Sequence, residues 1–279
     1  MATDKLTRLF LRYCRGPGHP AKFRLITYAG RWLLPAQGVV VTLNEGFHMR
    51  LQVFDHLERC LVMRGDYEPL TSRFARANIR PGGVAVVAGA NVGYYPLLLA
   101  HAAGPAGRVL GMEPFPGNMD RCQKNLRLNP GLARSITLFA GALGRHPDFV
   151  RISSPPVEHS GLAQLRADAD EGVFVKVERL DNLVGRLLPH RPDLMILDVE
   201  GWESEALAGF GDSRPDLLII ENDSRHQAAR GLSEASLFEL LTNLGYALAH
   251  LDGRPAKPGD FYPEQTLVAW QPGVSPVWI

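Results

Sequence analysis

Two different patterns of apolar residues divide the chain near residue 80. Before that point, the apolar runs Gly38–Leu43 and Phe47–Phe54 are separated by Asn44-Glu45-Gly46. This spacing predicts an antiparallel hairpin, because glycine readily takes the positive φ that a tight turn needs. After that point, Val84–Ala88 is short and wholly apolar, which is typical of a strand buried on both faces of a parallel sheet.

From residue 84 onward, short apolar runs alternate with stretches of helical periodicity. The predicted strands are Val84–Ala88, Arg108–Met112, Ser135–Ala140, Phe174–Val177, Leu194–Asp198 and Leu217–Glu221. The helices predicted after them run to Ala103 and over Phe115–Leu128, Asp181–Leu188, Trp202–Phe210 and Ser233–Leu244. Tyr246–Leu251 and Thr266–Trp270 form a final antiparallel pair. Alternation of this kind predicts an α/β fold with an open, doubly wound and mostly parallel sheet.

The pattern also predicts how the chain is divided. Residues 1–80 form an N-terminal extension with a basic helix at the start, the hairpin, a helix over Asp55–Met63 and a second helix capped by Asp66. Residues 81–279 form the sheet domain. Residues 151–172 contain Pro155-Pro156 and little periodicity, so we expect a surface excursion there.

Composition narrows the class of protein. The chain has 279 residues, of which 46% are apolar, with 30 Lys and Arg against 29 Asp and Glu. A net charge of +1 argues against nucleic acid as the partner. No apolar run approaches the length of a transmembrane helix, and three scattered cysteines fit the cytoplasm. The basic amphipathic start is interpreted as packing on the protein's own body, with contact to a membrane surface as the alternative.

The first two strands of the sheet domain end in residues suited to a nucleoside cofactor. Gly89 and Gly93 bracket a tight turn from strand to helix, where backbone N–H groups approach a ligand. Glu113 ends the second strand, where a carboxylate accepts hydrogen bonds from ribose hydroxyls. The alternative is that both glycines only pack and that Glu113 is solvated. The spacing does not match the G-x-G-x-x-G of nicotinamide enzymes.

Three motifs in order, VAGANVGYY, GRVLGMEPFPGNMDRCQKNLRLN and LDVEGWESEALAGF, resemble the FkbM family of S-adenosylmethionine-dependent methyltransferases. The resemblance spans well over half the chain and implies a Rossmann-like class I methyltransferase sheet with an antiparallel last strand. It implies methyl transfer to a hydroxyl of a sugar, macrolide or other specialised metabolite. The implied cofactor site comprises Gly89, Ala90, Asn91, Gly93, Glu113, Pro114, Asn118, Gly141, Ala142 and Asp198.

Two positions depart from the family pattern. Val87 stands where the family has an aspartate, and Ile196 stands where it has a lysine. Because the two strands are expected to be neighbours, we interpret the change as the compensated loss of a buried ion pair, which often leaves stability intact. The alternative is that the missing acid weakens cofactor binding, by about 1–3 kcal/mol.

Candidate catalytic residues lie at or after the ends of the predicted strands Leu194–Asp198 and Leu217–Glu221. Asp198 is the candidate general base, with Glu200 and His226 as further candidates. Asp198, Glu221 and Asn222 together are a less favoured magnesium site. Trp202 is expected to pack, with a place in the acceptor pocket as the alternative.

These observations favour a cytoplasmic O-methyltransferase that converts S-adenosylmethionine to S-adenosylhomocysteine while methylating a small-molecule acceptor. Acceptor selectivity is expected from residues 153–170 and from the first 50 residues, including Tyr28 and Trp32. The rival interpretations are a methyltransferase-like protein that binds the cofactor or its product without turnover, and a nicotinamide oxidoreductase. The sequence indicates neither the acceptor nor the oligomeric state.

Overall fold

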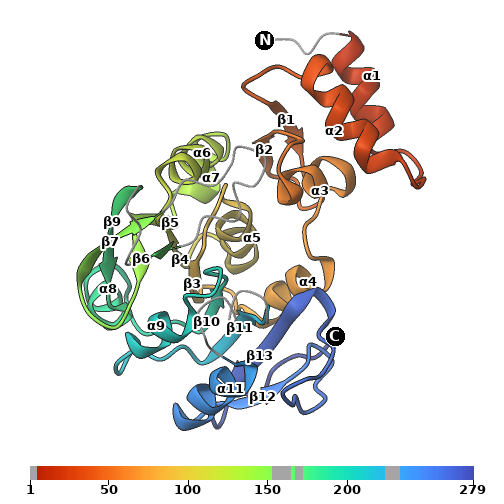
Figure 1. The fold of residues 1–279 in the computed structure, drawn as a ribbon. Coiled ribbons are helices and arrows are strands. Elements are labelled where there is room, and N and C mark those ends of the chain that lie inside the picture. The colour runs from red at the N-terminus through yellow and green to blue at the C-terminus, as the bar shows by residue number, and fades with distance from the viewer. Residues whose placement is uncertain (1–4, 153–164, 167–171, 224–232) are drawn as a thin grey trace.

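The computed structural model of the chain describes residues 5–152, 165–166, 172–223 and 233–279. Its centre is a seven-stranded sheet (Figure 1) in the order β12-β13-β11-β10-β3-β4-β5. The strands are β3 (Val84–Ala88), β4 (Arg108–Glu113), β5 (Ile136–Ala140), β10 (Leu194–Leu197), β11 (Leu217–Glu221), β12 (Ala247–Ala249) and β13 (Thr266–Trp270).

The order of the strands confirms a doubly wound sheet. β3 pairs in parallel with both β4 and β10, so the chain reverses direction across the sheet between these strands. β13 is antiparallel to β11 on one side and to β12 on the other. In open α/β sheets, ligands bind beyond the carboxyl ends of the strands at such a reversal. The ends of β3, β4 and β10 therefore mark where a site is expected.

Alternating side chains of the strands build a core on each face of the sheet. Val87 and Ile196 belong to the core that also contains helix α5, whereas Val86 and Leu197 belong to the core beneath α8, α9 and α11. The helices of this domain are α5 (Tyr94–Ala103), α6 (Pro116–Arg127), α7 (Pro130–Ala133), α8 (Leu180–Leu187), α9 (Glu203–Ala208) and α11 (Glu234–Asn243), with a 3₁₀ turn η2 (Pro263–Gln265).

The N-terminal extension contains the predicted hairpin, confirmed as the antiparallel pair β1 (Val39–Thr42) and β2 (His48–Leu51). The free edge of β2 is satisfied by the sheet domain. The His48 N–H donates to Asn129 Oδ1 at 2.8 Å, and the Arg50 N–H donates to Asn125 Oδ1 at 2.7 Å. Buried strand edges need such partners, so these asparagines dock the extension on α6 and α7.

The helices of the extension are α1 (Lys5–Cys14), α2 (Lys22–Leu33), α3 (His56–Arg64) and α4 (Pro69–Asn78). The prediction that Asp66 caps the fourth helix is wrong, because that helix begins after Glu68 with Pro69 in its first turn. Proline is favoured at the first position of a helix, because its fixed φ suits the helix and the N–H that it lacks would have no partner within the helix there. Helix α2 was not predicted from the sequence.

A second, four-stranded sheet comprises β6 (Ala142–Leu143), β7 (Asp148–Ile152), β8 (Leu165–Arg166) and β9 (Val173–Glu178) in the order β6-β9-β7-β8. The predicted strand Phe174–Val177 lies in β9, outside the main sheet. The excursion expected at residues 151–172 begins in strand β7, because Arg151 and Ile152 pair with β8 and β9. Pairing between strands, rather than periodicity, organises the described part of this segment.

Candidate functional site

The turn from β3 into α5 brings two strand ends into contact. Gly89 has φ +90°, and a Cβ built on it would lie 1.8 Å from the carbonyl oxygen of Asp198. Gly93 also has a positive φ, and a Cβ there would meet Cys122 Sγ at 3.0 Å. Only glycine fits the first position, because both the backbone conformation and the space exclude a side chain. The ends of β3 and β10 therefore lie against each other.

Glu113, at the end of β4, holds this turn in place. The backbone N–H of Asn91 donates to Oε2 at 2.8 Å, and that of Phe115 donates to Oε1 at 2.9 Å. Asn118 also hydrogen-bonds this carboxylate. Burial raises the pKa of Glu113 to about 7, against the lowering effect of these donors. A carboxylate offers about four lone-pair sites, so Glu113 retains capacity for ligand hydroxyls.

A cleft of about 560 Å³ lies at the carboxyl ends of these strands. Eight of the ten residues proposed for the cofactor line it: Gly89, Asn91, Glu113, Pro114, Asn118, Gly141, Ala142 and Asp198. Ala90 and Gly93 do not line this cleft and belong to the turn behind it. Glu200, from the list of catalytic candidates, also lines the cleft, together with Leu143 and Val199. Residues far apart in sequence therefore form one concave surface.

Carboxylates gather beside the cleft. Asp198, Glu200 and Glu221 each place an oxygen within 4.8 Å of the others. Burial raises the pKa of Asp198 and of Glu221 well above the ordinary range, and the charges of neighbouring carboxylates raise them further. The side chains of Asp198 and Glu221 hydrogen-bond to each other. The two acids are coupled, because the charge of one makes it harder to ionise the other.

A second, smaller cavity of about 280 Å³ shares Asp198 with the cleft. The N-terminal extension contributes Glu68 and Thr71 to its wall, and the sheet domain contributes Tyr95, Glu221 and Glu264. Tyr95 Oη donates to Glu68 Oε2 at 2.6 Å, and burial raises the pKa of Glu68 to about 7. Glu68 was not among the candidate residues that the sequence indicated.

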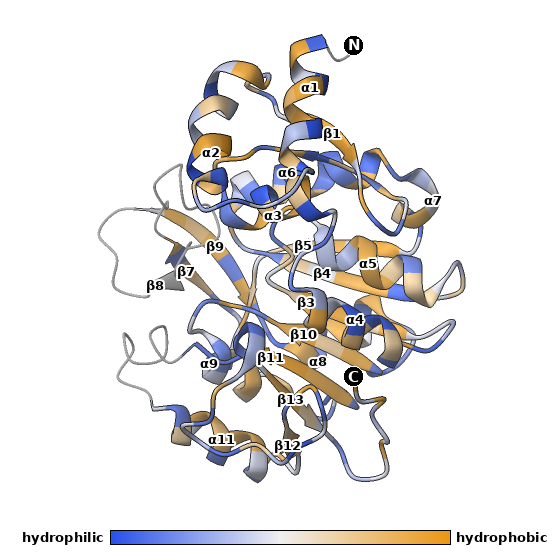
Figure 2. Ribbon diagram, turned by 90° about the vertical axis from the view of Figure 1, so that its right-hand side faces the viewer, coloured by the Kyte–Doolittle hydropathy of each residue, from blue (hydrophilic) through white to orange (hydrophobic). Residues whose placement is uncertain are grey.

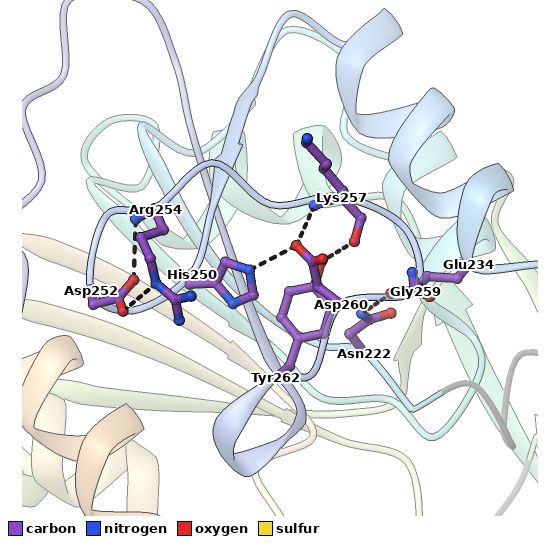
Figure 3. A network of polar contacts seen from close by, with 9 residues as sticks. All are labelled: Asn222, Glu234, His250, Asp252, Arg254, Lys257, Gly259, Asp260 and Tyr262. Atoms are coloured by element: carbon purple, nitrogen blue, oxygen red, sulfur yellow. Dashed lines mark hydrogen bonds and ion pairs between the residues drawn. The ribbon is translucent and has the colours of Figure 1, made fainter.

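Several sequence candidates lie elsewhere. The side-chain amide of Asn222 donates to Glu234 Oε1 at 2.7 Å, in the polar network that includes Gly259 (Figure 3). This bond directs the amide nitrogen of Asn222 toward Glu234, whereas the third carboxylate beside Asp198 and Glu221 is that of Glu200. Trp202 Nε1 donates to the carbonyl of Leu143 at 2.8 Å, and the ring is buried, so it packs as expected. His226 lies outside the described residues.

Two of the residues expected to select the acceptor do not line the cleft or the smaller cavity. Tyr28 and Trp32 are exposed on α2 and line neither the cleft nor the smaller cavity. Residues 153–164 and 167–170 of the expected selectivity segment lie outside the described part of the chain.

Val87 and Ile196 are direct register partners in the parallel pair of β3 and β10. Both side chains are buried, and both belong to the core on the α5 face of the sheet. The two positions that depart from the family pattern are therefore neighbours in space. This geometry fits an exchanged pair.

The strand order, the antiparallel β13 and the cleft at the reversal point define a class I, Rossmann-like methyltransferase. Comparison with known families then identifies the methyltransferase family. The model of the family described as Methyltransferase FkbM domain matches residues 88–248, so the chain belongs to this family.

Among the described residues, no helix has both the length and the apolar character that a membrane span requires.

Individual relatives are distant. The AMB antimetabolite synthetase AmbE of Pseudomonas aeruginosa is 27% identical in an alignment of 207 residues, and the match covers 61% of this chain and 10% of the synthetase. The methyltransferase FkbM structure from Methylobacillus flagellatus is 18% identical with a TM-score of 0.45, over 71% of this chain and 50% of that one. The Aeropyrum pernix fibrillarin structure with natively bound S-adenosyl-L-methionine is 13% identical with a TM-score of 0.43, over 72% and 77% of the two chains.

Proposed function

We propose that this methyltransferase uses S-adenosylmethionine to methylate a hydroxyl oxygen of a sugar or another specialised metabolite in the cytoplasm. The observation that carries the proposal is the cleft that joins Gly89, Glu113 and Asp198 at the reversal point of the sheet. When bound, the cofactor supplies a methyl group on a positively charged sulfur.

The donor set of the cleft fits this cofactor. Glu113 would accept hydrogen bonds from the ribose hydroxyls, and Gly141 and Ala142 would border the adenine. The methionine part would lie against the backbone of the turn that Gly89 and Asn91 contribute to the cleft. The carboxylates around Asp198 complement a positive charge, because like-charged acids that are buried together favour a nearby cation.

Asp198 and Glu221 are proposed to take up the proton that the acceptor hydroxyl loses. A pair that shares one proton keeps one carboxylate available as a base, while its partner stays neutral. The smaller cavity places hydrogen-bond acceptors on the far side of Asp198, namely Glu68 and Glu264, which suit an acceptor rich in hydroxyl groups. Buried cysteines fit the proposed cytoplasmic location, since Cys14, Cys60 and Cys122 are all free thiols.

The experiment is methyl transfer from labelled S-adenosylmethionine to a panel of sugars and hydroxylated metabolites, combined with calorimetric binding. We expect D198N to bind the cofactor within about three-fold of wild type and to lose about 10²-fold or more in rate, the usual contribution of a general base. E205Q, on the neighbouring helix α9, is the control and should transfer normally. Equal activity of D198N and wild type would overturn the role of Asp198.

A protein that binds the cofactor without turnover is the second candidate. The apolar pair Val87 and Ile196 favours it, because a buried acid is absent beside the cofactor cleft. Tight binding of S-adenosylhomocysteine with no transfer to any acceptor in the panel would support this candidate against the enzyme.

Magnesium is the alternative role for Asp198, Glu200 and Glu221, whose oxygens are of the type this cation prefers. We propose a site without metal, in which these carboxylates act on the proton of the acceptor hydroxyl instead. Dialysis against EDTA should leave the rate unchanged. A loss of activity that added Mg²⁺ restores would overturn this choice.

A further inference from the structure

Helix α2 carries an apolar ridge on the side that faces away from the core. Its buried residues are Lys22, Ile26 and Gly30. Leu25, Tyr28 and Trp32 follow at spacings of three and four residues, so they share another face of the helix. Their exposed fractions are 47%, 72% and 79%. Single exposed apolar residues are ordinary, but three along one helix face form a surface that needs an explanation.

Helix α1 repeats this arrangement. Thr7, Phe10 and Cys14 are buried, but Leu6 and Leu9 are each 65% exposed, and Tyr13 on the same face is 38% exposed. The sequence analysis interpreted the apolar side of this helix as packing on the protein's own body. The buried residues Thr7, Phe10 and Cys14 confirm this packing, whereas the face with Leu6, Leu9 and Tyr13 is exposed to solvent.

The charge of this segment differs from that of the whole chain. Residues 5–44 contain no Asp or Glu, although the chain as a whole is nearly neutral. The cations of the segment are Lys5, Arg8, Arg12, Arg15, Lys22, Arg24 and Arg31. Except for Lys22, all of them are exposed. An apolar ridge with aromatic residues and flanking cations therefore stands on a segment that contains no acids.

We propose that α1 and α2 dock the protein on the surface of an anionic lipid bilayer. Leucine and aromatic side chains insert at the level of the headgroups, where Trp and Tyr are favoured, and Lys and Arg attract anionic lipids. Figures 1 and 2 both place the two helices together at one end of the molecule, and Figure 2 shows hydrophobic and hydrophilic residues interleaved along them. The ridge residues line neither the cleft nor the smaller cavity, so docking leaves the site accessible.

The test is co-sedimentation of the full chain with vesicles of phosphatidylcholine, alone or mixed with phosphatidylglycerol. We expect binding to the mixed vesicles that weakens with added salt, and little binding to phosphatidylcholine alone. The triple variant L25S/Y28S/W32S should bind at least about ten-fold more weakly. The charge variant R8Q/R12Q/R24Q should lose about 100-fold, at roughly five-fold for each cation.

The matched control is F261S, which removes an aromatic residue that is 85% exposed elsewhere on the surface. It should bind vesicles like wild type. Circular dichroism and the melting temperature establish that each variant is folded, and the emission of Trp32 should shift to shorter wavelength on binding. Absence of binding to the mixed vesicles, or unchanged binding of the triple variant, would overturn the proposal. A wild-type dimer that L25S/Y28S/W32S converts to a monomer would also overturn it, in favour of a second copy as the occupant.

Discussion

Gly89 shows how one residue sets the spacing of the site. A methyl group there would overlap the carbonyl oxygen of Asp198, and the backbone is in a conformation that other residues resist. We expect G89A to lower the free energy of unfolding by more than about 1 kcal/mol and to abolish cofactor binding. G131A, where a Cβ meets no atom within 4 Å, is the control and should change stability by less than that. Urea denaturation and calorimetry measure both effects.

Glu68 is expected to make stability depend on pH. Its pKa is raised from 4.5 to about 7 by burial, so the folded protein holds the proton more tightly than the unfolded chain. The cost of ionising Glu68 is absent below about pH 4.5, grows as pH rises and is complete above about pH 7. E68Q should therefore stabilise the protein by about 2–3 kcal/mol at pH 8.5 and by much less at pH 5.

Urea denaturation at the two pH values tests this expectation. The glutamine keeps an oxygen that accepts the hydrogen bond from Tyr95, so the change isolates the charge. E239Q, at an exposed position of α11, should show no such difference between the two pH values. An equal effect of E68Q at both pH values would mean that burial does not penalise the charged form.

At the scale of elements, the pair β3 and β10 joins the two strands that carry the site. Val87 lies opposite Ile196 in its register, and both are in the same core. V87D should lower the free energy of unfolding by about 3–5 kcal/mol, because it buries a charge without a partner. Adding I196K should recover most of this loss, since the new lysine can pair with the new aspartate. Thermal melts compare the variants, and a double variant no more stable than V87D would contradict the idea of an exchanged ion pair.

Several elements were predictable because their cause is local. The hairpin β1–β2 follows from two β-prone runs and a glycine turn, and β3 follows from five consecutive apolar residues. The start of α4 was predicted two residues too early, because Asp66 is a good cap but Pro69 decides where the helix begins. Strands β7 and β8 were missed because the segment shows little periodicity, and only their pairing in the second sheet defines them.

At the scale of the whole molecule, binding of the cofactor should raise the free energy of unfolding. A ligand that binds only the folded state at 100 times its Kd adds about 2.7 kcal/mol to the free energy of unfolding. S-adenosylmethionine and S-adenosylhomocysteine should each raise the melting temperature by several degrees, and NAD should not. A scanning fluorescence melt measures all three. Stabilisation by NAD alone would contradict the proposed cofactor.

The sequence by itself determined the class of the sheet, the family and the positions of Gly89, Glu113 and Asp198, because strand periodicity and short motifs are written in neighbouring residues. The tertiary structure alone decided which carboxylates meet. It brought Glu68 and Glu200 to Asp198 and turned Asn222 toward Glu234. It also left the apolar ridge of α2 in solvent. Such outcomes depend on how distant segments pack, and packing is a property of the folded chain that no local pattern contains.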